Sequence, residues 1–204
     1  MPRASSRALP RTLPLLTAAA LVAACGPRAF TRGAYEDPNT IELLSDQFNE
    51  NDLQLIAKKM TGSLLGAPVV QALPGRPVLV VGRVRNKTSE HIDTESLADK
   101  VRVELQRSGR FAFADAAARE QIAAEYDYQQ SGMVAKETAK GPGAQVGADC
   151  VLTGQIASIV QEVGADKVVY YKMTMQLTDL RTGLITWTDE KELRKKFRKQ
   201  SVGW

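Results

Sequence analysis

Residues 167–179 read KVVYYKMTMQLTD, a pattern typical of a β-strand. Tyr171, Met173, Met175 and Leu177 alternate with polar residues, which is the period of two expected of a strand with one buried face. Similar strand-like runs flank it at residues 149–160 and 184–195. The turn sequences GAD and DLRTG, of hairpin length, separate the three runs. The last third of the chain is therefore predicted to be an antiparallel three-strand meander.

The sequence before the meander mixes strand-like and helix-like segments. Two runs are typical of strands: the continuous apolar run at residues 77–82, expected to be buried on both faces, and a short one at 110–114. Segments with helical character lie at residues 51–66, 93–109, 115–129 and, weakly, 135–147, with a short helical turn at 40–48. Asn51 or Asp52 is expected to cap the first of these helices. Together the segments predict an α/β fold, a single sandwich domain with a mixed β-sheet and helices packed on it.

The first 24 residues have the features of a secretory signal peptide. Three arginines precede the run LPLLTAAALVAA, which is too short to cross about 30 Å of hydrocarbon. The stretch LVAAC resembles the lipobox of bacterial lipoproteins. That resemblance implies cleavage before Cys25, a diacylglycerol on its sulfur and an acyl chain such as palmitate on its amine, which together anchor a protein stably. A free cysteine after an ordinary signal peptide is the alternative.

The expected organisation is a signal peptide at residues 1–24, a lipidated N-terminus and short tether at 25–50, and a globular domain at 51–204. Removing the signal peptide deletes three arginines and no acid, so the formal net charge of +4 falls to +1. This balance gives little support for nucleic-acid binding. With Cys25 acylated, Cys150 has no cysteine to pair with, and it is expected to be a small buried residue.

The polar stretch around His91, the single histidine of the chain, is a candidate active site. A metal site would need several ligands at fixed spacing, and a general base would need a recognisable nucleophile nearby. The sequence indicates neither, so no metal, no cofactor and no enzymatic activity are predicted. The structural interpretation accounts for its neighbours: Asn86 and Thr88 form turns, and Asp93 accepts hydrogen bonds from the first amides of the next helix.

Several stretches together resemble the family of penicillin-binding protein activators of the LpoB type. They are VRNKTSEHIDTESLADKVRVEL, YQQSGMV, VGADCVLTG and YYKMTMQLTDLRTGLITW followed by DEKELRK, in this order between Leu53 and Lys196. The resemblance implies a lipoprotein without catalytic activity that binds a docking domain of a class A penicillin-binding protein and stimulates peptidoglycan synthesis. Gly26 after the lipidated cysteine resembles enteric sorting signals for the outer membrane, with the domain facing the periplasm.

The chain departs from the family pattern in its tether. Enteric members have long proline-rich linkers, whereas about fifteen residues here reach only ~50 Å when fully extended. Two alternative functions are an outer-membrane export lipoprotein of the curli type, which would need membrane-spanning hairpins that the chain has no surplus segments to supply, and a general envelope scaffold. A monomer is expected.

Two groups of residues are candidates for partner binding. The first is the polar loop with Asn86, Thr88 and His91, because binding loops are commonly mounted at strand ends. The second is the basic strand end with Arg194, Lys195 and Lys196, which suits an acidic docking domain or anionic lipid.

Overall fold

The computed structural model describes residues 35–38 and 40–199, and those from residue 40 onward belong to one compact unit. The predicted signal peptide, Cys25 and the first part of the tether lie outside the described residues. The elements, in chain order, are α1 Glu50–Gly66, α2 Pro68–Gln71, β1 Val78–Lys87, α3 Thr94–Arg107, β2 Ala112–Phe113, α4 Arg119–Tyr128, a π-helical turn Gln129–Met133, β3 Cys150–Val163, β4 Asp166–Asp179 and β5 Ile185–Arg198.

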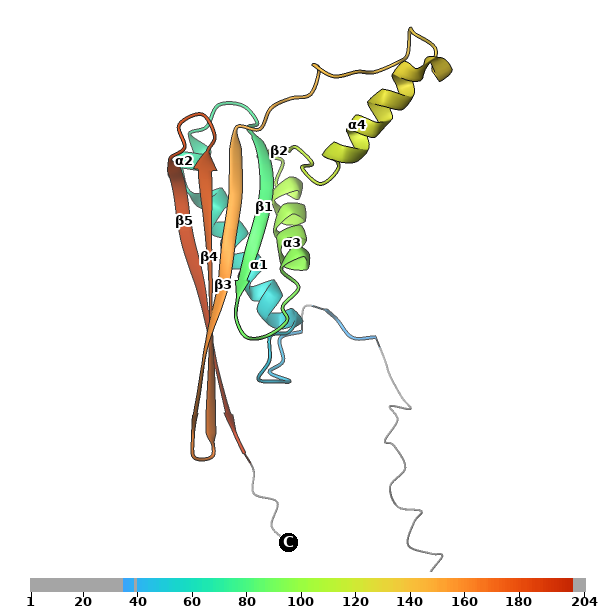
Figure 1. The fold of residues 1–204 in the computed structure, drawn as a ribbon. Coiled ribbons are helices and arrows are strands. Elements are labelled where there is room, and N and C mark those ends of the chain that lie inside the picture. The colour runs from blue at the N-terminus through green and yellow to red at the C-terminus, as the bar shows by residue number, and fades with distance from the viewer. Residues whose placement is uncertain (1–34, 39, 200–204) are drawn as a thin grey trace, which may run out of the picture. The chain divides into compact units, whose positions relative to one another are not determined.

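The strands form one mixed sheet in the order β2-β1-β3-β4-β5 (Figure 1). β1 runs parallel to β2 and β3, and β3, β4 and β5 form an antiparallel meander. Gly164 and Gly183 lie in the two hairpin turns with φ of +58° and +74°, conformations that favour glycine. The predicted α/β class and the predicted meander are both confirmed.

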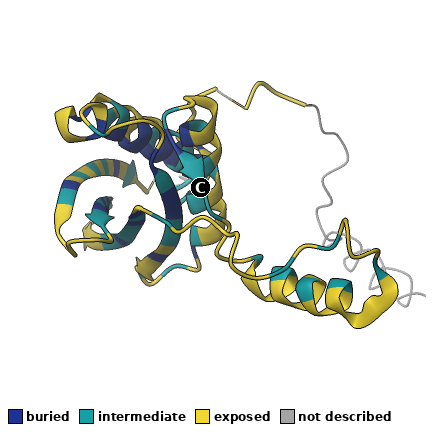
Figure 2. Cartoon of the chain, turned by 90° about the horizontal axis from the view of Figure 1, so that it is seen from above, coloured by how far each residue is buried: buried dark blue, intermediate teal, exposed yellow. Residues whose placement is uncertain are grey.

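Helices α1 and α3 pack on one face of the sheet, α1 against β5 and α3 against β1 (Figure 2). The alternating side chains of β4 form the centre of this core. Its fully buried members include Ile56, Met60, Leu64, Leu97, Val101, Leu105, Tyr171, Met173, Met175 and Leu177. The polar residues that alternate with them lie on the opposite face of the sheet, which we call the open face.

Local signals located the helices but not all of their ends. Asn49 caps α1, not Asn51 or Asp52 as predicted. The Asn49 side chain accepts a hydrogen bond from the Asp52 amide at 3.3 Å, and Asp52 Oδ2 accepts one from the Asn49 amide at 3.0 Å. This reciprocal pair is a capping box, which satisfies two amides at once. Asn51 is instead buried and donates to the carbonyl of Glu42 at 2.8 Å.

Two predicted helical segments are not helical. Residues 135–147 contain only turns and irregular backbone, and Pro142 and Gly143, with φ of +100°, break any regular helix there. Residues 40–48 contain no helical turn and follow an irregular path along the domain. The strand predicted at 77–82 exists and continues to Lys87, but full burial on both of its faces is limited to Leu79 and Val80.

The β3–β4 hairpin continues beyond the end of β1 (Figure 1). Pairing of β1 with β3 ends at Lys87 and Ala157, whereas β3 continues to Val163 and β5 follows β4 to Arg198. Within the described residues, Ser158–Val163 therefore has β4 as its sole strand neighbour. We call residues 158–170, together with the end of β5 and Lys199 that follows it (residues 194–199), the hairpin tip.

Candidate functional site

The polar loop around His91 is held together by its own side chains. The Asn86 amide group donates to the carbonyl of Glu90 at 2.8 Å, and Asn86 Oδ1 accepts from the backbone amide of Thr88 at 2.9 Å and its hydroxyl at 2.8 Å. Asp93 Oδ1 accepts from the amides of Glu95 and Ser96, at 3.1 and 3.0 Å, and so caps α3. The predicted turn and cap are both confirmed.

Glu90 ties this loop to the body of the domain. One carboxylate oxygen accepts from the backbone amide of Phe48 at 2.9 Å, and the other accepts from the hydroxyl of Tyr171. Burial raises the pKa of Tyr171 above its ordinary value, and the neighbouring carboxylates, with Glu90 first, raise it further. Tyr171 therefore remains a neutral donor at physiological pH, and Glu90 has a structural function.

His91 lies exposed on the rim of an open groove of about 600 Å³. The groove runs between the loop and the start of α1, and its walls include Phe48, Leu53 and Ser96. Around His91, Asn86, Thr88, Glu90 and Asp93 each form the structural hydrogen bonds described above. In the described part of the chain, no group of three or more His, Cys, Asp and Glu residues is placed to hold a metal ion.

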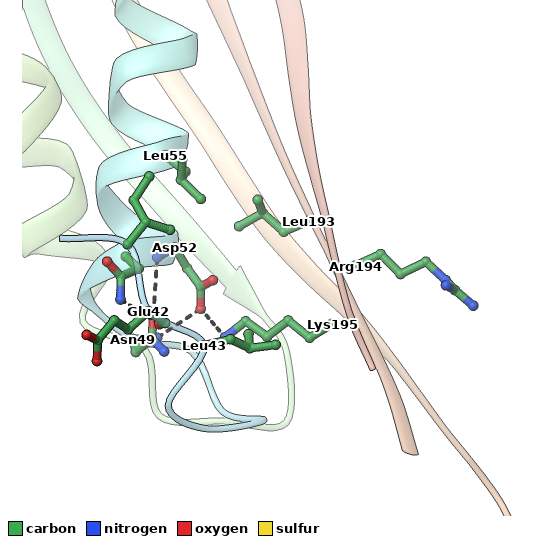
Figure 3. A pocket seen from close by; sticks show the side chains of 10 residues that line it. Glu42, Leu43, Asn49, Asp52, Leu55, Leu193, Arg194 and Lys195 are labelled. Atoms are coloured by element: carbon green, nitrogen blue, oxygen red, sulfur yellow. Dashed lines mark hydrogen bonds and ion pairs between the residues drawn. The ribbon is translucent and has the colours of Figure 1, made fainter. Parts of the chain in front are cut away.

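Lys195 does not belong to the exposed basic strand end. It lies on the helix-covered face of β5, where its ammonium contacts Asp52 Oδ2 at 2.5 Å and donates to the carbonyl of Gln47 at 2.8 Å. The side chains of Lys195 and Asp52 are each only 5% exposed. Figure 3 shows Lys195 directed toward α1 and Arg194 directed to the other side of the strand, beside a cavity of about 150 Å³. Lys195 is thus a core residue.

Arg194 and Lys196 are exposed and lie on the open face, as their alternation with Lys195 requires. Three strand spacings, about 14 Å, separate β5 from β1 and its loop. The structure therefore does not bring the two predicted groups of partner-binding residues into one site. Glu90 ties the loop to Tyr171 on the helix-covered face, whereas Arg194 and Lys196 lie on the open face.

A shallow groove of about 320 Å³ crosses the open face. Its lining includes Arg83 and Arg85 on β1, Thr153 and Gln155 on β3, and Thr174 and Gln176 on β4. Arg85 reaches Gln155 at 3.4 Å. Arg83 and Arg85 are not among the residues predicted from the sequence to bind a partner. Their alternation with the apolar Val84 could have identified them, because it places both arginines on the exposed side of β1.

Cys150 is buried at the start of β3, as predicted. Burial raises the pKa of its thiol, and the carboxylates of Asp179 and Asp149 raise it further. The reactive thiolate is therefore disfavoured. Among the described residues, no helix is both long and apolar enough to cross a membrane.

Comparison with known proteins gives one family and a set of solved structures. The family described as peptidoglycan-synthase activator LpoB matches residues 52–193. No curated protein matches the sequence. The LpoB C-terminal domain from Salmonella enterica has 19% identity and a TM-score of 0.46, with 71% of this chain and 99% of that chain covered.

Two structures from Escherichia coli are similar to the same extent. The LpoB C-terminal domain has 21% identity and a TM-score of 0.45, covering 70% of this chain and 98% of that chain. The NMR structure of LpoB has 19% identity and a TM-score of 0.43, covering 95% and 94%. Because the family match extends over residues 52–193, most of the sequence, the chain belongs to the family of peptidoglycan-synthase activators described as LpoB.

Proposed function

We propose that this protein is an outer-membrane lipoprotein without catalytic activity that binds a class A penicillin-binding protein and stimulates its peptidoglycan synthesis. The family match over residues 52–193 carries the proposal. The hydrogen bonds of Asn86, Thr88, Glu90 and Asp93 support it, because they assign structural tasks to the side chains around His91.

The proposed anchor is Cys25, acylated after removal of residues 1–24, with the domain facing the periplasm. Residues 42–49, predicted to belong to the tether, are fixed to the domain through the carbonyls of Glu42 and Gln47 and the amide of Phe48. The tether is therefore limited to about the fifteen residues from Gly26 to Thr40, which span at most ~50 Å. A synthase anchored in the inner membrane must extend towards this domain to meet it.

The open face is the proposed contact surface for the synthase. Arg83 and Arg85 border its groove on β1, and Arg194 lies across the sheet on β5. Arginine on such a face offers a planar fork of donors that pairs with carboxylates of an acidic docking domain. The loop with Asn86, Thr88 and His91 is the second proposed contact. Asn86 and Thr88 would shape it and His91 would contact the partner.

The deciding experiment is a pull-down from envelope extracts with the mature protein as bait, followed by assay of the captured synthase. We expect recovery of a class A penicillin-binding protein and faster glycan polymerisation when the activator is added. If the bait instead forms a ring-shaped oligomer that captures a secretion substrate and no synthase, the export function is correct and the activator function is wrong. Separately, Cys25→Ser should abolish fractionation with outer membranes, and continued pelleting would disprove the lipid anchor.

A further inference from the structure

The open face of the hairpin tip is divided into an apolar side and a basic side. The strand register places its residues in three rows across β3, β4 and β5. These rows are Ile159–Tyr170–Arg194, Gln161–Val168–Lys196 and Val163–Asp166–Arg198. Each row ends in a cation on β5, and two of the three begin with an aliphatic residue on β3.

Three aliphatic side chains of the tip, those of Ile159, Val160 and Val163, are not part of the core, unlike Val169. Ile159 is 58% exposed and Val163 is 78% exposed, and Val160 on the other face is also exposed. They project beyond the end of β1, where α1 and α3 no longer cover the sheet. A group of exposed aliphatic residues at the end of a projecting hairpin indicates an interaction surface.

The charges of the tip favour an anionic partner. Residues 158–170 and 194–199 contain six basic and two acidic residues, a difference of +4. Asp52 offsets the buried Lys195, and Asp166 offsets one charge of Lys196 and Arg198, which contact it at 3.0 and 2.7 Å. Lys167 contacts Asp46 at 2.6 Å and Glu162 at 3.4 Å, and Lys199 lies 3.9 Å from Glu162, so the six cations exceed the four contacting acids by two. The side chains of Lys196, Arg198 and Lys199 are 55%, 73% and 75% exposed.

The chain enters the domain at this same end. Asp46 contacts Lys167 of the tip at 2.6 Å, and Gln47 accepts from Lys195. Cys25 precedes Asp46 by only 21 residues. A domain tethered through this segment would hold its tip close to the membrane that carries the anchor.

We propose that the hairpin tip binds the surface of an anionic phospholipid membrane. Ile159 and Val163 would enter the boundary between headgroups and acyl chains, while Lys196, Arg198 and Lys199 pair with lipid phosphates. The unpaired backbone groups of Ser158–Val163 confine the tip to the hydrated headgroup layer, because they would lose water in hydrocarbon. Which membrane the tip faces rests on the proposed lipid anchor. Binding through the tip leaves the groove bordered by Arg83 and Arg85 free for the synthase.

The test is co-sedimentation of the unacylated domain, residues 39–204, with lipid vesicles. This chain retains the core, because every buried residue of the described structure lies between Asn51 and Lys195. We expect binding to vesicles of phosphatidylglycerol and phosphatidylethanolamine, weakening as salt is added, and little binding to phosphatidylcholine alone.

Two variants separate the two sides of the tip. Arg198→Gln with Lys199→Gln should weaken binding about 25-fold, or about fivefold for each cation, the factor that corresponds to ~1 kcal/mol. Ile159→Thr with Val163→Thr keeps β-branched residues and should weaken binding about tenfold. The matched controls are Lys136→Gln with Lys140→Gln, and Leu180→Thr with Leu184→Thr in the opposite hairpin turn. All four control residues are exposed, and their substitution should leave binding unchanged.

Three outcomes would overturn the proposal: no vesicle binding, no preference for phosphatidylglycerol, or equal binding by the tip variants and the wild type. A concentration-dependent dimer that Ile159→Thr with Val163→Thr abolishes, without vesicle binding, would assign the edge of β3 to a second copy instead. The assay contains neither a lipid anchor nor a synthase. A negative vesicle result therefore does not contradict the proposed function. Likewise, a negative result for the lipid anchor or for synthase capture does not contradict vesicle binding by the tip.

Discussion

Lys195 and Asp52 join the last strand to the first helix through an ion pair with 2.5 Å between Nζ and Oδ2. Asp52 also forms half of the α1 capping box with Asn49. The Lys195 ammonium lies 5.5 Å from the ring centre of Tyr171, which itself packs edge-on against Phe48. The Asp52 carboxylate therefore joins the start of α1 to β5, and Lys195 in turn holds the carbonyl of Gln47 in the segment by which the chain enters the domain.

Lys195→Met should lower the free energy of unfolding by about 3–5 kcal/mol, because it leaves the Asp52 carboxylate buried without its partner. Its neighbour Arg194 is exposed, so Arg194→Ala should change stability by about 0.5 kcal/mol or less. Urea unfolding of the two variants measures the contrast. Equal losses would mean that the buried pair contributes no more than a surface cation.

Asp93→Ala should cost about 0.5–2 kcal/mol, because the α3 amides of Glu95 and Ser96 lose their acceptor. His91→Ala should have little effect on unfolding, since His91 is exposed. Thermal unfolding followed by circular dichroism gives both values. A purified domain with an enzymatic activity that disappears in the His91 variant would overturn the assignment of this loop as structural.

The contrast between these residues shows what the sequence could predict. Strand period and helical spacing are local, so they located the meander and the faces of α1 and α3. The same period separates Lys195 from Arg194 and Lys196, although the predicted partner-binding group includes all three residues. Applying the alternation would have placed Lys195 on the buried side.

The path of residues 40–49 could not be predicted in the same way. Phe48 bonds to Glu90, 42 residues away, and Gln47 bonds to Lys195, 148 residues away. No local pattern encodes such contacts, and helical spacing in the stretch suggested a turn that is absent. The projecting tip was also unpredictable, because it depends on where β1 stops pairing with β3.

Asp189 should make stability depend on pH in the acid range. Its carboxylate accepts from Lys59 of α1 at 2.7 Å and from the Ser63 hydroxyl, and these bonds, with Lys59 first, lower its pKa below the ordinary 3.8. A lowered folded-state pKa contributes stability above the unfolded-state pKa, and the contribution is lost as pH falls through the folded value. The difference in unfolding free energy between wild type and Asp189→Asn should therefore be constant above about pH 5 and shrink below 3.8.

Urea unfolding at a series of pH values measures this difference. A gap between wild type and Asp189→Asn that is undiminished at about pH 2 would show that the carboxylate charge is not its source. Lys59→Met is the matched variant. This variant should also reduce the pH dependence of stability, because it removes Lys59, the largest cause of the lowered pKa of Asp189.

The last prediction distinguishes the two proposed contacts with the synthase. Arg83→Glu with Arg85→Glu reverses the basic border of the open-face groove without touching the core, since both side chains are exposed. If the open face binds an acidic docking domain, this variant should associate more slowly, and its residual binding should depend less on salt. His91→Ala should then bind like the wild type. Association rates with immobilised synthase at several salt concentrations decide between the surfaces. If the Arg83 and Arg85 reversal leaves the low-salt rate unchanged while His91→Ala slows it, the loop is the contact and the open face is not.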